Sequence, residues 1–109
     1  MIDAPFDDAG TWPLKGVKVL DMGQVYNGPY AGMLMAQAGA DVVKVEPLEG
    51  EALRSRGGGK TPLAHVMLNA GKRGVAIDLK SDKGRAVFLD LVKKSDVLLE
   101  NFAPGAMER

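Results

Sequence analysis

Apolar residues concentrate in four short segments of the chain. In the first of them, residues 17–22, apolar and polar residues alternate, which is a pattern of β-strands. Each segment contains valine, a residue that favours strands. Gly23 follows the first segment and Pro47 follows the second, and both are residue types that interrupt regular structure. We therefore predict four strands, over residues 17–22, 41–46, 75–79 and 96–100.

A helix is predicted between the first two strands. Asn27 or Gly28 can cap it, Pro29 suits its first turn and Gly39 can end it. The segment is apolar on most sides, which indicates that it packs between the sheet and another element.

Further helices are predicted later in the chain. Ser81 can cap a helix over residues 82–94, whose apolar positions recur at intervals of three and four; these are Phe88, Leu91 and Val92. Residues 64–69 fit a short helix and residues 106–109 fit the start of another. Residues 48–62 are too rich in glycine for a regular element, so we expect a long loop there.

Strands that alternate with helices predict an α/β fold, a Rossmann-like open parallel sheet with flanking helices. Ligands of such sheets bind beyond the carboxyl ends of the strands. We expect residues 1–16 to form an N-terminal arm and residues 17–109 to form one domain, because 109 residues suffice for a single core. We expect this domain to be incomplete, because the length leaves no room for the second domain that many enzymes close over their active site.

Charge adds one candidate surface. The net charge is zero, but the first 50 residues are acidic on balance and the remainder basic. A basic cluster can receive an anionic ligand or can equally be a solvated face; its members are Arg54, Arg56, Lys60, Lys72 and Arg73. A neutral chain without interleaved aromatic residues is a poor nucleic-acid binder, so we expect no nucleic-acid partner.

Cysteine and histidine, which bind many metals and often act in catalysis, are scarce in the sequence. The chain has no cysteine and one histidine, His65, so we predict no metal site, and His65 fits an ordinary helical residue better than a base. The N-terminus is acidic and no apolar run reaches the ~18 residues of a spanning helix. We expect a cytoplasmic protein that does not enter a membrane.

Two nucleotide-binding motifs match only in part. Gly59-Lys60-Thr61 resembles the end of a phosphate-binding P-loop, but Arg54 stands where its first glycine belongs and Pro62 follows. Residues 23–28 begin and end with glycine but lack the internal glycine of a dinucleotide-binding turn. The general capacity of a helix N-terminus for anions remains.

Aromatic and amide side chains follow two of the predicted strands. Tyr26 and Asn27 come after the first, and Asn101 and Phe102 come after the last. An adenine can stack on Phe102. Equally, Phe102 can belong to the core while Asn101 caps the turn, and these residues alone leave both interpretations open.

Several ordered blocks together resemble the amino-terminal part of the family III CoA-transferases, the group that includes formyl-CoA transferase, carnitine CoA-transferase and the α-methylacyl-CoA racemases. The blocks are residues 13–21, 28–31, 34–46, 69–73, 77–80 with Gly84, and 96–109. The resemblance implies coenzyme A, as an acyl-CoA substrate, and a carboxylic acid as ligands. It also implies a homodimer of the full-length protein.

The resemblance places CoA contacts on ten residues: Tyr26, Asn27, Ile77, Asp78, Leu79, Lys80, Asn101, Phe102, Ala103 and Arg109. Pro47 occupies the place of a phosphate-binding arginine of formyl-CoA transferase, and Arg54 or Arg56 are candidates to replace it. Ala70-Gly71 replaces the more usual Arg-Asn.

In this family an aspartate forms the acyl anhydride and aspartyl-CoA intermediates, and it lies beyond residue 109. We therefore assign no catalytic residue here and expect an inactive amino-terminal fragment of a CoA-transferase. The alternatives are a fragment of an α-methylacyl-CoA racemase and a non-catalytic CoA- or nucleotide-binding module.

Overall fold

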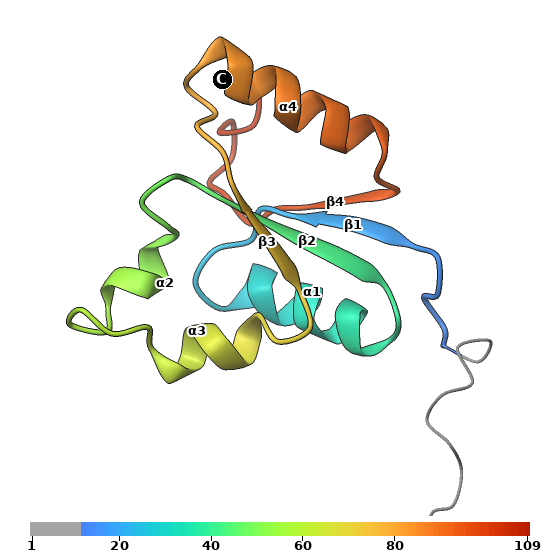
Figure 1. Ribbon diagram of the computed structural model, residues 1–109, viewed down its shortest axis with the longest axis horizontal. Helices are drawn as coiled ribbons and strands as arrows, with labels where there is room; N and C mark the ends of the chain where they lie inside the picture. The colour runs from blue at the N-terminus through green and yellow to red at the C-terminus, as the bar shows by residue number, and fades with distance from the viewer. Residues whose placement is uncertain (1–11) are drawn as a thin grey trace, which may run out of the picture.

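The computed structural model describes residues 12–109 as a four-stranded sheet with helices on both faces (Figure 1). The strands are β1 (Lys18–Asp21), β2 (Asp41–Glu46), β3 (Arg73–Ala76) and β4 (Val97–Leu99). All pair in parallel, in the order β3-β2-β1-β4. The predicted α/β class and parallel sheet are confirmed.

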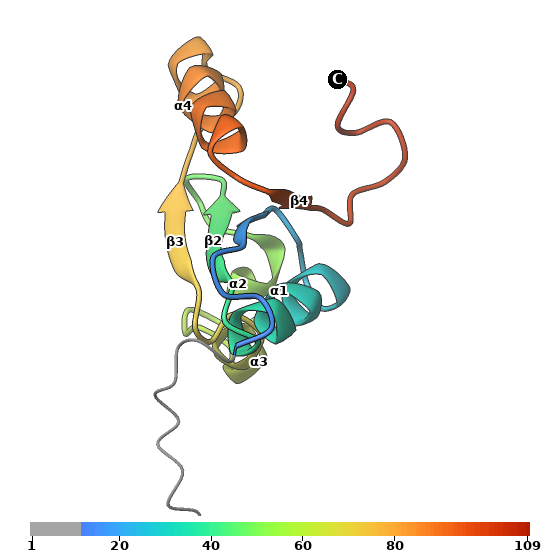
Figure 2. The same cartoon turned by 90° about the vertical axis from the view of Figure 1, so that its right-hand side faces the viewer.

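Four helices connect the strands. They are α1 (Asn27–Gln37), α2 (Ala52–Ser55), α3 (Leu63–Leu68) and α4 (Asp82–Lys93). In Figure 1, α4 lies above the sheet and α1 and α3 lie below it, and Figure 2 shows the same separation from the side. The predicted arm begins outside the described residues, but its end, from Trp12 to Gly16, forms a turn.

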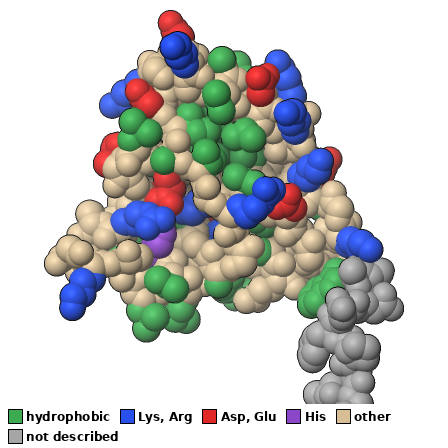
Figure 3. Space-filling view, viewed as in Figure 1, with side chains coloured by type: hydrophobic (Ala, Val, Ile, Leu, Met, Phe, Trp, Pro, Cys, Tyr) green, Lys and Arg blue, Asp and Glu red, His purple; other side chains and the backbone are tan. Residues whose placement is uncertain are grey.

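The sheet has a hydrophobic core on each of its two faces, and the strands contribute side chains to both. On the α1 face, Val19 of β1 and Val42 of β2 pack with Met35 of α1. On the α4 face, Leu20 and Val45 form the second cluster, which Phe88, Leu91 and Val92 of α4 cover in part. Hydrophobic side chains therefore gather between α4 and the sheet (Figure 3). Successive side chains of a strand point to opposite faces of the sheet, so β1 and β2 each contribute to both cores.

The N-termini of the two long helices differ. Ser81 caps α4 as predicted, because its hydroxyl accepts a hydrogen bond from the amide of Gly84 at 2.9 Å. The capping prediction for α1 is wrong: its N-cap residue is Tyr26, which makes no side-chain capping bond. Pro29 is in the first turn as expected. The outer side of α1 is exposed at Tyr30 and Leu34.

Two segment predictions are wrong. Residues 48–62 contain a helical turn, α2, because the Glu51 side chain caps it by accepting from the amide of Leu53. Residues 106–109 form turns instead of a helix, since Gly105 has a left-handed backbone (φ 79°) and only the Ala106 amide bonds back, to the oxygen of Ala103. The third strand also begins earlier and ends earlier than the sequence pattern indicates, at Ala76.

A buried ion pair ties β1 to the segment before β3. The Lys72 ammonium donates to Asp21 Oδ2 at 2.7 Å, to the Pro29 oxygen at 2.8 Å and to Asn69 Oδ1 at 2.8 Å. Burial lowers the pKa of the Lys72 ammonium, and the hydrogen bond and charge of Asp21 oppose that change. All three ammonium protons have partners, which offsets the desolvation of the charge.

Gly32 of α1 lies directly against this ion pair. A Cβ atom at position 32 would stand 2.5 Å from Asp21 Oδ2 and 3.0 Å from Lys72 Nζ. We predict that Gly32→Ala lowers the free energy of unfolding by roughly 2 kcal/mol, because the buried pair must shift. Urea denaturation measures this value. Gly74→Ala is the control, since nothing lies within 4 Å of a Cβ there; equal losses in both variants would contradict the explanation.

Candidate functional site

A hollow of about 350 Å³ lies at the carboxyl ends of the strands, where an open parallel sheet binds its ligands. Its walls come from the end of β2 and from the segments that directly follow β1, β2 and β3, together with Glu51 and Phe102. These segments are Met22–Gln24, Val45–Glu49 and Ile77–Lys80. The volume is within the range of ~300–1,000 Å³ typical of small-molecule sites.

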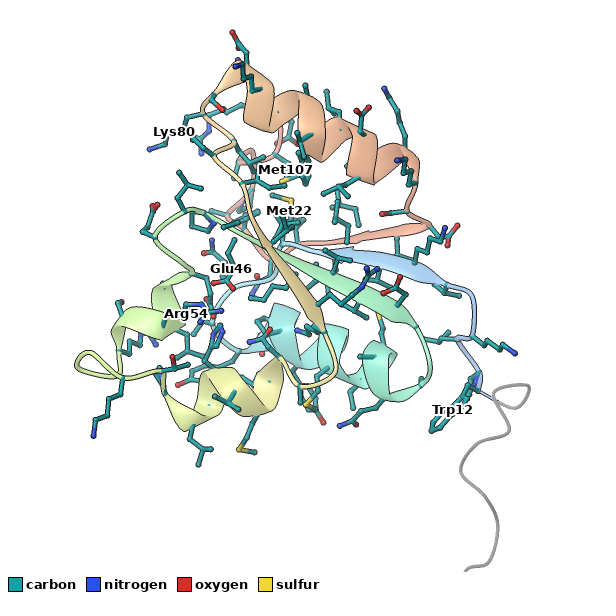
Figure 4. All side chains as sticks on the ribbon, viewed as in Figure 1. Trp12, Met22, Glu46, Arg54, Lys80 and Met107 are labelled. Carbon is teal, nitrogen blue, oxygen red and sulfur yellow. The ribbon has the colours of Figure 1, made fainter. Side chains whose placement is uncertain are left out.

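The floor of this hollow is apolar. Met22, Val45 and Ile77 are buried members of the core, and Phe102, which is half-buried, packs against them and lines the hollow. Among the described residues of the lining, the one cation is Lys80, which is exposed on the α4 side of the sheet (Figure 4). The lining also contains four acids, Glu46, Glu49, Glu51 and Asp78. An apolar part of a ligand can lie on the floor, and Lys80 is the residue that an anionic part would meet.

A second hollow of about 300 Å³ lies beside the start of α1. It is lined by Gln24, Val25, Tyr26, Asn27 and Asn101, and Gln24 belongs to both hollows. The Tyr26 side chain is 52% exposed.

The structure divides the ten residues predicted as contacts into three groups. Ile77, Asp78, Leu79, Lys80 and Phe102 line the larger hollow, and Tyr26, Asn27 and Asn101 line the smaller one. Ala103 and Arg109 are exposed and line neither. Phe102 packs against the core and also lines the larger hollow, so its place in the core does not exclude contact with a ligand. Asn101 pairs with the backbone of Gln24.

Side chains hold the loop that separates the two hollows. The amide of Gly23 donates to Asp21 Oδ1 at 2.7 Å, and its oxygen accepts from Lys44 Nζ at 2.8 Å. The Asn101 side chain pairs with both backbone groups of Gln24, at 2.7 and 3.0 Å. The amide of Val25 donates to Glu51 Oε2 at 3.0 Å. The backbone amides of this loop are thus engaged inside the protein.

The two glycines of the loop are required by close packing. A Cβ atom on Gly28 would stand 2.6 Å from the Cα of Gly23 and 2.9 Å from Asn101 Oδ1, and one on Gly23 would meet the backbone of Gly28 at 2.7 Å. The loop therefore turns back on itself at Gly23 and Gly28. This contact explains the two glycines without a pyrophosphate, in agreement with the missing internal glycine.

The predicted basic cluster is not a single site. Arg54 pairs with Glu46, Lys72 with Asp21 and Arg73 with Asp41. The Arg54 guanidinium makes two bonds to Glu46, at 2.6 and 2.7 Å, so it is already committed to a carboxylate (Figure 4). This pairing disfavours Arg54 as a replacement for the arginine missing at Pro47.

Sequence reasoning missed the residues that shape the loop, namely Asp21, Lys44 and Glu51. Asp21 and Lys44 belong to strands that contain other charged residues, so their burial was not visible in the pattern. The contact between Glu51 and His65 joins the N-cap of α2 to α3, and no sequence spacing relates these two positions. Among residues 12–109, the structure shows no cluster of three or more potential metal ligands. None of the helices in the same range has the length and apolar character to cross a membrane.

Glu46 is the wall residue with the strongest electrostatic perturbation. Burial raises the pKa of its carboxyl, but hydrogen bonds from Arg54 and the Glu51 amide and the charges of Arg54 and Lys44 outweigh burial. The pKa falls from 4.5 to about 2. Glu46 therefore stabilises the fold above the unfolded pKa near 4.5, and this contribution is lost as the pH falls toward about 2.

We predict that Glu46→Gln lowers stability at neutral pH and flattens the fall of stability between about pH 4.5 and about pH 2. The measurement is the free energy of unfolding in urea across that range. Asp41→Asn is the control, because Asp41 forms an exposed pair with Arg73 and such pairs contribute under about 1 kcal/mol. If the stability of Glu46→Gln falls between about pH 4.5 and about pH 2 as steeply as that of the wild-type protein, the lowered pKa of Glu46 is contradicted.

Comparison with known proteins identifies the family. The sequence profile of CoA-transferase family III matches residues 14–109. The formyl-CoA:oxalate CoA-transferase of Streptomyces coelicolor is 41% identical over 99 residues, covering 88% of this chain and 24% of that protein. The alpha subunit of succinyl-CoA–L-malate CoA-transferase of Chloroflexus aurantiacus is 43% identical over 101 residues, with coverages of 88% and 24%.

Solved structures agree with these sequence matches. The crystal structure of a CAIB/BAIF family protein from Brucella suis superposes with a TM-score of 0.82 at 34% identity, over 88% of this chain and 27% of that chain. A hypothetical protein from Mycobacterium tuberculosis superposes with a TM-score of 0.80 at 40% identity, over 88% and 26%. The chain spans about a quarter of the length of these relatives. The resemblance found in the sequence is thereby confirmed, and the chain belongs to CoA-transferase family III.

Proposed function

We propose that residues 17–109 form the CoA-binding part of an enzyme that transfers CoA between an acyl-CoA and a carboxylic acid. The observation that carries this proposal is the larger hollow, where Ile77, Lys80 and Phe102 meet at the carboxyl edge of the sheet. Family membership supports CoA as the ligand, and the two curated relatives described above are named as CoA-transferases.

The chemistry of the hollow suits the parts of CoA. Ile77, Leu79 and the ring of Phe102 offer apolar surface for the adenine or the pantetheine arm. Lys80 offers an ammonium, which forms charge-assisted hydrogen bonds with phosphate oxygens. The neighbouring Asp78 is engaged by the backbone, since its Oδ1 accepts from the Lys80 amide at 3.0 Å. Tyr26, Asn27 and Asn101 would contact the ligand from the smaller hollow, and Ala103 and Arg109 remain proposed contacts outside both hollows.

The transfer itself needs a nucleophile that we do not assign to any residue of this chain. In the proposed enzyme an aspartate carboxylate attacks the thioester carbonyl, forms an acyl anhydride and releases the CoA thiolate. The thiolate then attacks the aspartyl carbonyl, which forms the aspartyl-CoA thioester and frees the first acid. The acceptor carboxylate repeats the two steps in reverse order, so that the aspartate is regenerated. Binding of CoA by the described residues would place its thiol for these steps.

The alternatives are weaker. The racemase is not favoured, because the two curated relatives described above and an acetyl-CoA:oxalate CoA-transferase of Acetobacter aceti are named as transferases. A non-catalytic CoA-binding module remains the form in which the isolated 109-residue chain is expected to act. A cytoplasmic homodimer is our proposal for the whole enzyme.

We predict that the chain binds CoA and that Phe102→Ala weakens binding roughly tenfold, since it removes the aromatic wall of the hollow. Lys80→Gln should weaken the binding of CoA more than the binding of dephospho-CoA or pantetheine, because the contact that is lost is to phosphate. Isothermal titration calorimetry measures both effects.

Two variants control this experiment. Phe88→Ala removes a phenylalanine from the same core, but Phe88 does not line the hollow, and Lys93→Gln removes an exposed charge from α4. Both should leave the CoA affinity within about twofold. A Phe88→Ala variant that loses as much affinity as Phe102→Ala would show that only stability had changed. No heat of CoA binding by the folded wild-type chain would contradict the proposed function.

A further inference from the structure

Val25 adopts a backbone conformation that is unusual for its residue type. Its φ is 61°, in the left-handed region, and among the residues described it is the one non-glycine residue there. A β-branched side chain is disfavoured in this region. Such conformations persist where the surroundings impose them, and they cluster at ligand-binding and catalytic sites. The contacts of Val25 should therefore show what imposes its conformation.

The contact that holds Val25 comes from the side chain of Glu51. Glu51 is only 3% exposed, and its Oε2 atom accepts from the Val25 amide at 3.0 Å and from the Leu53 amide at 3.3 Å. Its Oε1 atom lies 3.0 Å from Nδ1 of His65. Because a carboxylate oxygen accepts, Nδ1 carries the proton and donates. With both oxygens engaged, the carboxylate has one orientation.

His65 is fixed from its other side. It is 4% exposed on α3, and its backbone oxygen accepts from Asn69 Nδ2 at 2.9 Å. Asn69 Oδ1 in turn accepts from Lys72 Nζ, which pairs with Asp21. Asp21 binds the Gly23 amide. A continuous chain of buried and partly buried polar contacts thus begins at Gly23, passes through His65 and Glu51, and ends at Val25.

The two residues that follow Val25 in the chain, Tyr26 and Asn27, line the smaller hollow. Tyr26 and Asn27 line it with Asn101, whereas His65 lines neither hollow. A change in the Val25 backbone would redirect Tyr26 and Asn27, because they follow it directly in the chain. His65 therefore influences the hollow only through Glu51 and Val25.

We propose that His65 and Glu51 are positioning residues, which hold Val25 in its left-handed conformation and so fix Tyr26 and Asn27 at the smaller hollow. The identity of the ligand used to test this, CoA, rests on the proposed function. The conformation of Val25 does not, so the two can fail separately.

Two variants of His65 separate positioning from simple packing. His65→Asn places an amide nitrogen near the position of Nδ1 and can still donate to Glu51. His65→Leu fills the space without a donor. The conformation of Val25 is read by NMR from the intraresidue nuclear Overhauser effect between its amide and α protons, which is strong when φ is positive. The dissociation constant for CoA is measured by calorimetry on the same samples.

We expect wild-type protein and His65→Asn to share the strong Val25 signal and a CoA affinity within about twofold. His65→Leu should lose the signal and weaken CoA binding roughly tenfold. A folded His65→Leu variant that keeps the signal would overturn the proposal, as would equal losses in both variants. A lost signal with unchanged CoA affinity would overturn the link to Tyr26 and Asn27.

Two further outcomes remain decisive. If His65→Leu does not fold, His65→Met replaces it, since methionine also fills the space without a hydrogen-bond donor for Glu51. A folded His65→Met variant that keeps the Val25 signal would overturn the proposal. If the wild-type chain binds no CoA, the proposed function fails, and the Val25 signal of the variants still decides the positioning role.

Discussion

The backbone from Gly23 to Val25 lies between β1 and α1, outside any strand or helix. Its amide and carbonyl groups therefore need hydrogen-bond partners from elsewhere in the protein. Side chains supply them all: Asp21, Lys44, Asn101 and Glu51 bind every polar backbone group from the Gly23 amide to the Val25 amide. These residues come from β1, from β2, from the segment after β4 and from the segment before α2. The loop is therefore fixed only when the sheet is assembled in its order β3-β2-β1-β4.

This arrangement explains why charges are buried in such a small domain. Asp21, Lys44 and Glu51 are each at most 3% exposed. Buried ion pairs contribute little net stability, because desolvation consumes much of the attraction between the charges. Their effect here is to select one conformation of the loop. The same loop then separates two hollows, and Gln24 contributes to both.

Much of the architecture could be predicted because it depends on local patterns. The run of valines before Pro47 defined β2 to the residue, and Ser81 with the spacing of Phe88, Leu91 and Val92 defined α4. The helical turn α2 was missed, since its cap is a glutamate whose carboxylate also binds Val25, 26 positions away along the chain. Contacts of that kind depend on tertiary structure, which no local pattern encodes.

The candidate site was predictable in part for the same reason. Parallel strands bring their following segments to one edge, so Ile77–Lys80 and Phe102 meet as expected. The division into two hollows was not predictable, because it results from the side-chain contacts of Gln24 and Val25. The pairing of Arg54 with Glu46 was equally hidden, although the sequence shows both charges.

Binding of CoA at the carboxyl edge of this sheet can be observed residue by residue. The experiment is a titration of the ¹⁵N-labelled chain with CoA, followed by two-dimensional NMR. We expect the amide shifts to concentrate at Ile77–Lys80, at Phe102 and at Gln24–Asn27. Shifts confined to the opposite edge, around Lys18, Arg73 and Ser95, or no shifts at all in the folded protein, would contradict it.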